Sequence, residues 1–310
     1  MREVTVIGSY IVAHVIDTDR IPVAGETVTG RNYHITHGGK GSNMACCAAR
    51  LGARAKFLGK VGTDFAGDAF VELLRKEGVD TEGVLRAQTL PTATGFIVSG
   101  QDGSNLIVID PGANGEFLPN DVADHGGLIG DVTLSPLEIP LETALAGARL
   151  AAQRGIPAIL NPAPAQNLRK SDLSSIFALT PNEVEGRVCL GRGADERAPQ
   201  AECARALLDL GPRHVILTLG AEGVLWASPS GLWRIPALAV EVVDTVGAGD
   251  AFNAGLAVGL SEGWEMGRAI AFGITAASLS TRKRETIDSY AYRDEVDSRV
   301  PEVLARIERC

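Results

Sequence analysis

Short apolar runs alternate with amphipathic stretches along most of the chain. The apolar run at residues 4–9 is typical of a central strand in a parallel sheet, and residues 56–60 predict the next strand. Between them, the small-residue stretch at residues 42–51 ends before a glycine and predicts a helix. Residues 68–77 have the apolar spacing of a second helix. This alternation predicts an α/β fold with a doubly wound, mainly parallel sheet flanked by helices.

The same alternation resumes after residue 131. It predicts strands at residues 132–134, 158–160, 176–179 and 214–219, helices at 141–154, 198–210, 264–280 and 293–309, and a hairpin at 223–233. A chain of 310 residues with this pattern is expected to form a single α/β domain spanning residues 1–310.

Two segments have a different pattern. Residues 26–35 alternate polar and apolar side chains, as a half-exposed strand does. Residues 92–99 and 106–110 are rich in β-formers, and the turn between them contains Asp102 and Gly103, which favours a hairpin. These segments therefore predict strands that lie outside the main core.

Composition and charge exclude several classes of protein. The net charge of −9 argues against nucleic acid as a partner, because binding it needs a concentrated positive surface. The five cysteines include no CxxC pair, so neither a disulfide framework nor a zinc site is expected. No charged leader precedes an apolar block, and no apolar run reaches membrane-spanning length. We therefore expect a reduced, cytoplasmic protein without a membrane partner.

The richest candidate chemistry lies at residues 240–260. A β-branched run at residues 240–243 predicts a strand, a turn containing Gly247, Ala248 and Gly249 follows, and residues 250–260 predict a helix. The first amides of a helix have no partners and its dipole favours negative charge, so the turn predicts a phosphate site. Asp250 would repel a phosphate there unless it serves as a base. A role as a simple helix cap remains the alternative.

Two stretches of the sequence resemble a known family. DTVGAGDAF (residues 244–252) and GGKGSNMACCAARLGA (residues 38–53) resemble the two signatures of the ribokinase-like (PfkB) carbohydrate kinases, and they occur in the family's order. The resemblance extends over nearly the whole chain, is greatest to the ribokinase type, and includes AGETVTG (24–30), LNPAPA (160–165), TPNE (180–183) and LTLGAEGV (217–224).

The resemblance implies a role for each matching residue. Asp250 would be the base that takes the proton from the hydroxyl attacking the γ-phosphate of ATP, beside an anion hole of Gly247, Ala248 and Gly249 amides. The other roles that it implies are acceptor binding by Gly39, Lys40, Asn43 and Glu138, nucleotide binding by Asn182, Thr218, Gly220 and Gly223, Mg²⁺ binding through water by Asn182 and Glu185, and monovalent cation binding by Asp244.

Some of these residues have simpler interpretations. Glu138 could be an ordinary solvated loop carboxylate, and Asn182 could cap a helix, a role that is compatible with metal binding. The resemblance also implies a small β lid, formed by about residues 10–36 and 92–110, that excludes water from the reaction. Family members often form homodimers through this lid.

The chain departs from the family at three places. Ile11 and Ala13 replace an asparagine and an aspartate that bind sugar hydroxyls, so we hypothesise that the acceptor presents a less hydroxylated or more apolar face to these two residues and that ribose is disfavoured. No glycine follows residues 281–285, where the family binds a monovalent cation, so we predict weak or absent K⁺ dependence. The usual polar residue on the adenine side aligns with Gly273, which argues against a strict preference for ATP.

The function expected from the sequence is ATP-dependent phosphorylation of a hydroxyl on a small sugar or polyol. A different class stays open, namely a sugar- or nucleotide-binding regulatory protein of the same fold with weak catalysis. An NAD-dependent enzyme is disfavoured, because no GxGxxG follows the first predicted strand.

Overall fold

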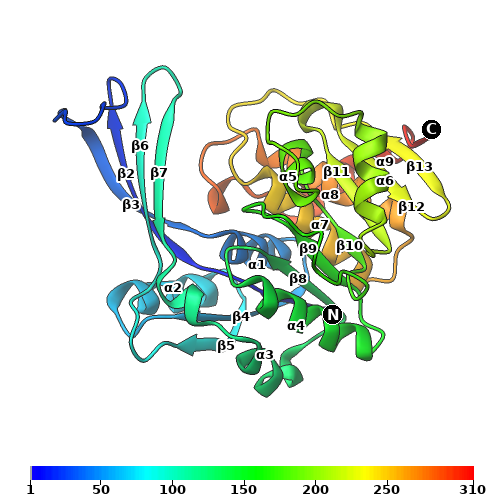
Figure 1. Cartoon of the computed structure of the whole chain (residues 1–310), viewed down its shortest axis with the longest axis horizontal. Coiled ribbons are helices and arrows are strands. Elements are labelled where there is room, and N and C mark those ends of the chain that lie inside the picture. Colours follow the sequence, from blue (N-terminus) through cyan, green and yellow to red (C-terminus); the bar gives the residue numbers. More distant parts are fainter. Residues whose placement is uncertain (1) are drawn as a thin grey trace.

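Two β-sheets of unequal size organise the chain (Figure 1). The computed structural model describes residues 2–310. A ten-stranded sheet runs through the body, and a four-stranded sheet stands away from it. The predicted α/β fold class, with a mainly parallel sheet flanked by helices and a smaller second sheet, is confirmed.

The large sheet has the order β14-β13-β12-β11-β10-β9-β8-β1-β4-β5, and it is parallel from β11 to β5. Its strands are β1 (Glu3–Ile7), β4 (Arg54–Val61), β5 (Asp80–Arg86), β8 (Val132–Pro136), β9 (Ala158–Asn161), β10 (Ala178–Leu179), β11 (His214–Thr218), β12 (Val224–Ser228), β13 (Gly231–Ile235) and β14 (Glu308–Arg309). Buried apolar residues fill the central strands, as parallel sheets covered on both faces require.

Helices cover both faces of this sheet and bury two separate cores. One core includes side chains of α1 (Lys40–Arg50), α2 (Phe65–Lys76), α7 (Ala248–Ser261), α8 (Met266–Ser280) and α9 (Arg293–Leu304). The other includes side chains of α3 (Pro119–Asp124), α4 (Leu141–Gln153), α5 (Glu183–Cys189) and α6 (Gln200–Leu208). No helix within residues 2–310 combines the length and the apolar character needed to cross a membrane.

The small sheet, which we call the lid, has the order β3-β2-β6-β7. Its strands are β2 (Ile11–Thr18), β3 (Arg31–Gly38), β6 (Thr94–Gly100) and β7 (Asn105–Asp110). Cross-strand pairing aligns Ala13 with Gly95 and Gly95 with Ile109, while Phe96 pairs with His14 and Val108. Side chains alternate between the two faces of a sheet. The row of Ala13, Gly95 and Ile109 faces the body, and the row of His14, Phe96 and Val108 faces away from it.

Several predicted elements were wrong in position or kind. Residues 240–243 form no strand, because Val242 and Val243 are exposed and the edge of the sheet beyond β13 is occupied by β14. The strand expected at residues 26–35 is β3, which begins at Arg31. The last helix ends at Leu304 instead of continuing to residue 309. Strand β5 and helix α3 were not predicted.

Candidate active site

Three adjoining cavities lie where β1, β8, β9, β10 and β11 end and where α1 and α7 begin. The lid cleft, about 520 Å³, includes Ile11, Ala13, Gly39, Asn43, Glu138, Asp244 and Asp250 in its walls. The polar cavity, about 200 Å³, includes Lys40, Asn182, Glu185, Gly247 and Asp250. The apolar cavity, about 140 Å³, includes Thr218, Gly220, Gly223, Ala248 and Gly249. Every candidate site residue named from the sequence therefore lines at least one of the three.

The glycines before α1 allow that helix to begin against the lid's connection to the body. Gly39 caps α1 with a φ of 91°, in the region that favours glycine. A Cβ placed there would lie 2.8 Å from the backbone nitrogen of Ile11. The close approach brings the first turn of α1, which carries Lys40 and Asn43, into the wall of the lid cleft.

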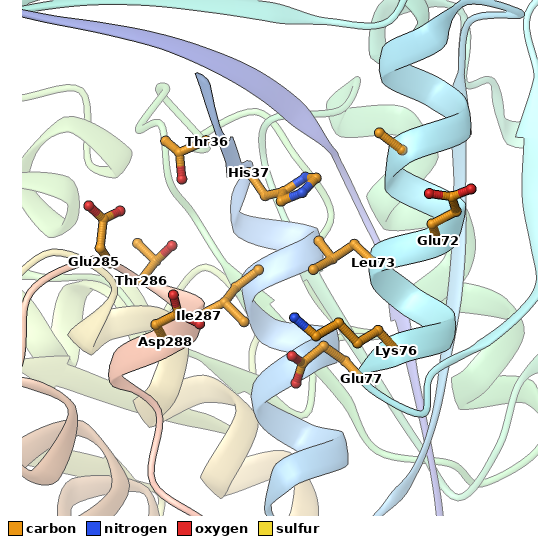
Figure 2. Close-up of a pocket in the computed structure, with 11 residues that line it drawn as sticks. Thr36, His37, Glu72, Leu73, Lys76, Glu77, Glu285, Thr286, Ile287 and Asp288 are labelled. Carbon is orange, nitrogen blue, oxygen red and sulfur yellow. The ribbon is translucent and has the colours of Figure 1, made fainter. Parts of the chain in front are cut away.

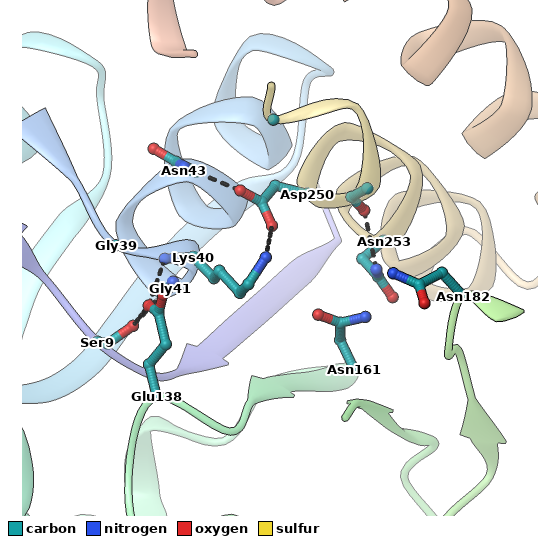
Figure 3. Close-up of polar contacts among 12 residues, drawn as sticks. Ser9, Gly39, Lys40, Gly41, Asn43, Glu138, Asn161, Asn182, Asp250 and Asn253 are labelled. Carbon is teal, nitrogen blue, oxygen red and sulfur yellow. Dashed lines mark hydrogen bonds and ion pairs between the residues drawn. The ribbon is translucent and has the colours of Figure 1, made fainter. Parts of the chain in front are cut away.

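Asp250 lies in the first turn of α7 and is almost completely buried (Figure 3). Asn43 donates its Nδ2 hydrogen to Asp250 Oδ2 at 2.8 Å. The other oxygen, Oδ1, lies 3.8 Å from Lys40 Nζ and has no hydrogen bond within residues 2–310. One carboxylate oxygen is thus anchored and the other is free to accept a proton.

The charges around Asp250 have opposing effects on its pKa. Burial raises the pKa of Asp250, and the nearby Lys40 ammonium and the Asn43 hydrogen bond partly offset that rise. The Asp250 carboxylate in turn raises the pKa of Lys40, so the lysine stays protonated at neutral pH. A carboxylate whose pKa lies above its ordinary value is better suited to accept a proton than an unperturbed aspartate is.

Glu138 holds the start of α1 in place. Its Oε2 accepts hydrogen bonds from Ser9 Oγ at 2.5 Å and from the Lys40 backbone N–H at 2.7 Å. Burial raises the pKa of Glu138, and these hydrogen bonds together with the Lys40 charge oppose that rise. Figure 3 shows Lys40 extending from this anchor toward Asp250. The carboxylate therefore has a positioning role, in addition to the acceptor contact expected from the sequence.

The turn before α7 offers backbone donors beside Asp250. Gly247 caps α7 with a left-handed φ of 79°, which again favours glycine. The Ala248 N–H already donates to the Thr245 carbonyl at 3.3 Å, whereas those of Gly247 and Gly249 have no partner among residues 2–310. Of the three predicted amides, the two from the glycines are thus the most available to an anion.

The polar cavity is lined by oxygen-bearing side chains. Asn182 and Glu185 form a capping box at the start of α5: Asn182 Oδ1 accepts from the Glu185 N–H, and Glu185 Oε2 accepts from the Asn182 N–H, both at 2.8 Å. The predicted cap at Asn182 is confirmed. Burial raises the pKa of Glu185, and its second carboxylate oxygen is not used by the capping box.

The sequence interpretation missed three residues of the polar cavity. Thr180 Oγ1 donates to Asn253 Oδ1 at 2.6 Å, and Asn253 Nδ2 donates to the Gly249 carbonyl at 2.8 Å. Asn161 Nδ2 donates to the Thr180 carbonyl at 2.9 Å. Asn253 lies three residues after Asp250 and therefore on the same side of α7, a spacing that could have identified it.

Gly273 does not line the apolar cavity. It lies in the contact between α7 and α8, where a Cβ would be 2.7 Å from the Phe252 carbonyl oxygen. The residues of α8 that line the cavity are Ile274, Ala277 and Ser278, and of these only Ser278 has a polar side chain.

Asp244 and residues 281–285 lie near each other beside the lid cleft. The backbone N–H groups of Val243 and Asp244 both donate to the Thr281 carbonyl, at 2.7 and 3.1 Å. Asp244 Oδ1 accepts from the Val246 N–H at 3.0 Å. Glu285 has a φ of 73°, the left-handed conformation that glycine adopts most easily. The turn therefore keeps a glycine-like backbone although it contains no glycine.

A fourth cavity, about 360 Å³, adjoins the lid cleft and shares Thr36, His37, Glu285 and Thr286 with it. Figure 2 shows Lys76, the last residue of α2, and the following Glu77 facing Ile287 and Asp288 across this space. It contains none of the candidate site residues. Within residues 2–310 there is no cluster of three histidine, cysteine or acidic side chains that could hold a metal ion, in this cavity or elsewhere.

Comparison with known proteins points to one family. The model of the pfkB family carbohydrate kinases matches residues 1–291. Ribokinase of Haemophilus influenzae is 36% identical over 296 residues, which cover 95% of this chain and 97% of that protein. Ribokinase of Bacillus subtilis is 39% identical over 282 residues, or 90% of this chain and 93% of that protein.

Solved structures agree with these relatives. The ribokinase of Thermotoga maritima superposes with a TM-score of 0.88 at 33% identity, covering 96% of this chain and 99% of that one. The ribokinase of Arabidopsis thaliana, in complex with ribose and ATP, superposes with a TM-score of 0.85 at 28% identity, covering 96% of this chain and 98% of that one. Similarity therefore extends over both the body and the lid.

Proposed function

Because the chain belongs to the pfkB family of carbohydrate kinases, we propose that it transfers the γ-phosphate of ATP to a hydroxyl of a small sugar or polyol, with Asp250 as the general base. The observation that carries this proposal is the position of Asp250. Its buried carboxylate lies between the lid cleft and the polar cavity, with one oxygen anchored by Asn43 and the other free.

The reaction follows from this arrangement. An acceptor hydroxyl in the lid cleft gives its proton to Asp250 while its oxygen bonds to the γ-phosphorus. The bond between the γ-phosphorus and the oxygen that bridges to the β-phosphate breaks, and ADP leaves with that oxygen. The acceptor is held by Gly39, Lys40, Asn43 and Glu138, and the protonated Lys40 also attracts the transferring phosphoryl group from its position between the two cavities.

Backbone groups stabilise the charge of the phosphoryl group in transit. The free amides of Gly247 and Gly249 point from the first turn of α7, whose dipole adds to their effect, and Ala248 joins them if its weak bond to Thr245 opens. Removal of one such donor from an oxyanion hole typically lowers kcat by about 10² to 10³.

The polar cavity suits a hydrated Mg²⁺ ion. Magnesium prefers oxygen ligands, retains several waters and usually contacts only one or two carboxylates together with substrate phosphates. Glu185, with its unused oxygen, would hold the ion through water, supported by Asn182, and both side chains are already fixed by their capping box. When bound, the ion would neutralise phosphate charge during transfer.

The apolar cavity suits the nucleoside of ATP. Thr218 ends β11 beside it, Gly220 and Gly223 lie in the turn between β11 and β12, and Phe252 and Ile274 supply a surface on which a base can stack. The Arabidopsis thaliana ribokinase structure contains ATP together with ribose, which supports the same choice of donor here. The side chains around the base are mostly apolar, so we expect only a modest preference for ATP over other nucleotides.

The test is ADP release with ATP, Mg²⁺ and a library of sugars and polyols. We expect turnover with at least one acceptor, and its loss in Asp250→Asn. Nucleotide and sugar binding without turnover on any acceptor would instead indicate the regulatory alternative, while absence of nucleotide binding would contradict the proposal entirely.

We also propose that residues 10–36 and 92–110 act as the lid of one domain, residues 1–310, and that two copies of the chain associate through it. The outer face of the lid exposes Tyr33, Ile35, Phe96 and Val108, and such a contiguous apolar face is typical of an interaction site. Sedimentation should show a dimer that Phe96→Asp dissociates. A monomer for the unmodified chain would refute the association.

A further inference from the structure

We propose that the acceptor is amphipathic: a sugar or polyol with hydroxyls along one edge and deoxygenated or methyl-bearing carbons along the edge that faces the lid. This inference rests on the proposed kinase function and specifies the substrate class of the same site. It follows from the contrast between the two walls of the lid cleft.

The body wall needs hydroxyl groups. Asn43 Oδ1 and Asp250 Oδ1 are buried and have no hydrogen-bond partner within residues 2–310. Both are acceptors, so each requires a donor, and unmet buried acceptors are costly. Lys40, which lies 3.8 Å from Asp250 Oδ1, adds donors of its own to the same wall. A substrate edge with two or more hydroxyls satisfies these groups.

The middle of the lid wall offers hydroxyls almost nothing. Two cross-strand rows face the cleft: Thr36, Ala13, Gly95 and Ile109 form one, and His34, Val15, Ile97 and Ile107 form the other. The polar members, Thr36 and His34, both lie on β3, and the other members of the rows, together with Ile11, contain no donor and no acceptor. A substrate hydroxyl pressed against them loses water without a new partner, which weakens binding by about 5-fold to 150-fold.

The lid wall also has room for carbon. Ala13 and Gly95 are neighbours in one row and have the smallest side chains in it. A carbon atom added at Gly95 would lie 3.4 Å from Ile11 Cγ2 and 3.9 Å from Ile109 Cγ1, which is van der Waals contact without a severe clash. A methyl or methylene group of the acceptor that approaches Gly95 would therefore have isoleucine on two sides.

The first test compares substrates that differ by one hydroxyl. kcat/KM is measured for D-ribose and 2-deoxy-D-ribose, L-mannose and L-rhamnose, L-galactose and L-fucose, and erythritol and 1,2,4-butanetriol. We expect the deoxy member to exceed its parent at least about fivefold in at least one pair, the factor that corresponds to one hydroxyl left unpaired. Preference for the parent in every pair would overturn the inference while leaving the kinase function intact.

The outcomes distinguish this inference from the proposed function. Nucleotide binding without turnover of any member of the four pairs would count against the inference. If neither nucleotide binding nor turnover with the wider library occurs, the proposed function itself fails. Turnover of a deoxy member in preference to its parent supports both.

The second test changes the lid wall itself. Ala13→Asn and Ile109→Asn place an amide against the acceptor, so the ratio of deoxy to parent kcat/KM should fall about fivefold. Leu106→Asn is the matched control, because Leu106 lies on the same strand as Ile109, is similarly exposed (42% against 48%), faces outward and is not among the residues proposed for the dimer contact. Ala13 is buried, and should its variant misfold, the exposed Ile109 variant still decides the outcome. An unchanged ratio in the folded inner variants, or an equal change in Leu106→Asn, would overturn the inference.

Discussion

The two walls of the lid cleft differ in polarity and in how their side chains are held. On the body side, the side chains around the reacting centre are held by fixed hydrogen bonds: Glu138 accepts from Ser9 and from the Lys40 backbone, and Asn43 holds one oxygen of Asp250. On the lid side, apolar side chains such as Ile107 and Ile109 remain about half exposed and have no such anchors.

The difference separates chemistry from selection. A preorganised polar wall can stabilise the same reacting atoms in any acceptor, because its groups are fixed before the substrate arrives. An apolar wall on a separate sheet can change its side chains without disturbing those groups. Changes in the body wall should therefore alter turnover for every acceptor, while changes in the lid wall should alter which acceptor is preferred.

The largest effect is expected from Asp250→Asn. Loss of a general base should lower kcat by about 10² to 10⁴ for all acceptors alike. Stability at pH 7 should stay equal or rise, because burial raises the pKa of Asp250 and its ionised form therefore opposes folding above its ordinary pKa. Steady-state kinetics and thermal unfolding check both parts. Retention of turnover above a tenth of the original would refute the assignment.

The second largest effect is expected on the stability of the elements that form the body wall. The largely buried Arg50 pairs with Glu77 at 2.7 Å and donates to the carbonyls of Ile287 and Tyr290, which ties α1 to α2 and to the segment beside the cleft. Arg50→Leu leaves Glu77 buried and unpaired, so it should lower the free energy of unfolding by about 3–5 kcal/mol.

The matched control for that change is Arg54→Leu, which removes an arginine whose partner, Glu3, lies in an exposed pair. It should cost less than about 1 kcal/mol, the usual limit for an exposed ion pair. Urea unfolding of both variants measures the two losses in the free energy of unfolding. Equal losses would show that the buried contacts of Arg50 have no special role.

A smaller effect concerns pH. The Lys40 ammonium lowers the pKa of Asp250 against the rise caused by burial, so Lys40→Met should raise that pKa further. The base must be ionised to act, so the acid limb of the kcat/KM profile should move to higher pH. Lys76→Met removes a lysine from the fourth cavity, away from Asp250, and should leave the pH of the acid limb unchanged. If both variants keep the original limb, Lys40 does not control the base.

The smallest effect is expected at Glu285. Its left-handed φ of 73° strains a non-glycine residue, so Glu285→Gly should raise the free energy of unfolding by about 1 kcal/mol. Asn32→Gly is the control, because Asn32 has a φ of 54° but asparagine tolerates that conformation. The unmodified chain can also be assayed in K⁺ and in Na⁺, because we predict that its rate depends little on K⁺. A large rate increase in K⁺ would contradict that prediction.

Local patterns were enough to predict most of the body. Apolar runs and helical spacing depend on nearby residues, so β1, β4, α1, α4 and the β12–β13 hairpin occur where the sequence predicted them, within a few residues. Several candidate site residues also came together, because Glu138, Asn182 and Thr218 follow or end the parallel strands β8, β10 and β11. What remained hidden depended on partners distant in the chain.

Two cases show this dependence. Residues 240–243 have the composition of a strand, but the sheet edge they would join is occupied by β14 from the far end of the chain. Asn253 gains a role only from Thr180, 73 residues away.

The most direct test of the division between the walls is a crystal structure with a preferred acceptor and a non-hydrolysable ATP analogue. It should place one acceptor hydroxyl about 2.6–3.2 Å from Asp250 Oδ1, within hydrogen-bond reach. The acceptor's carbon edge should contact Ala13 and Ile109. An acceptor hydroxyl that points to the γ-phosphate from elsewhere, with Asp250 out of reach, would contradict the account.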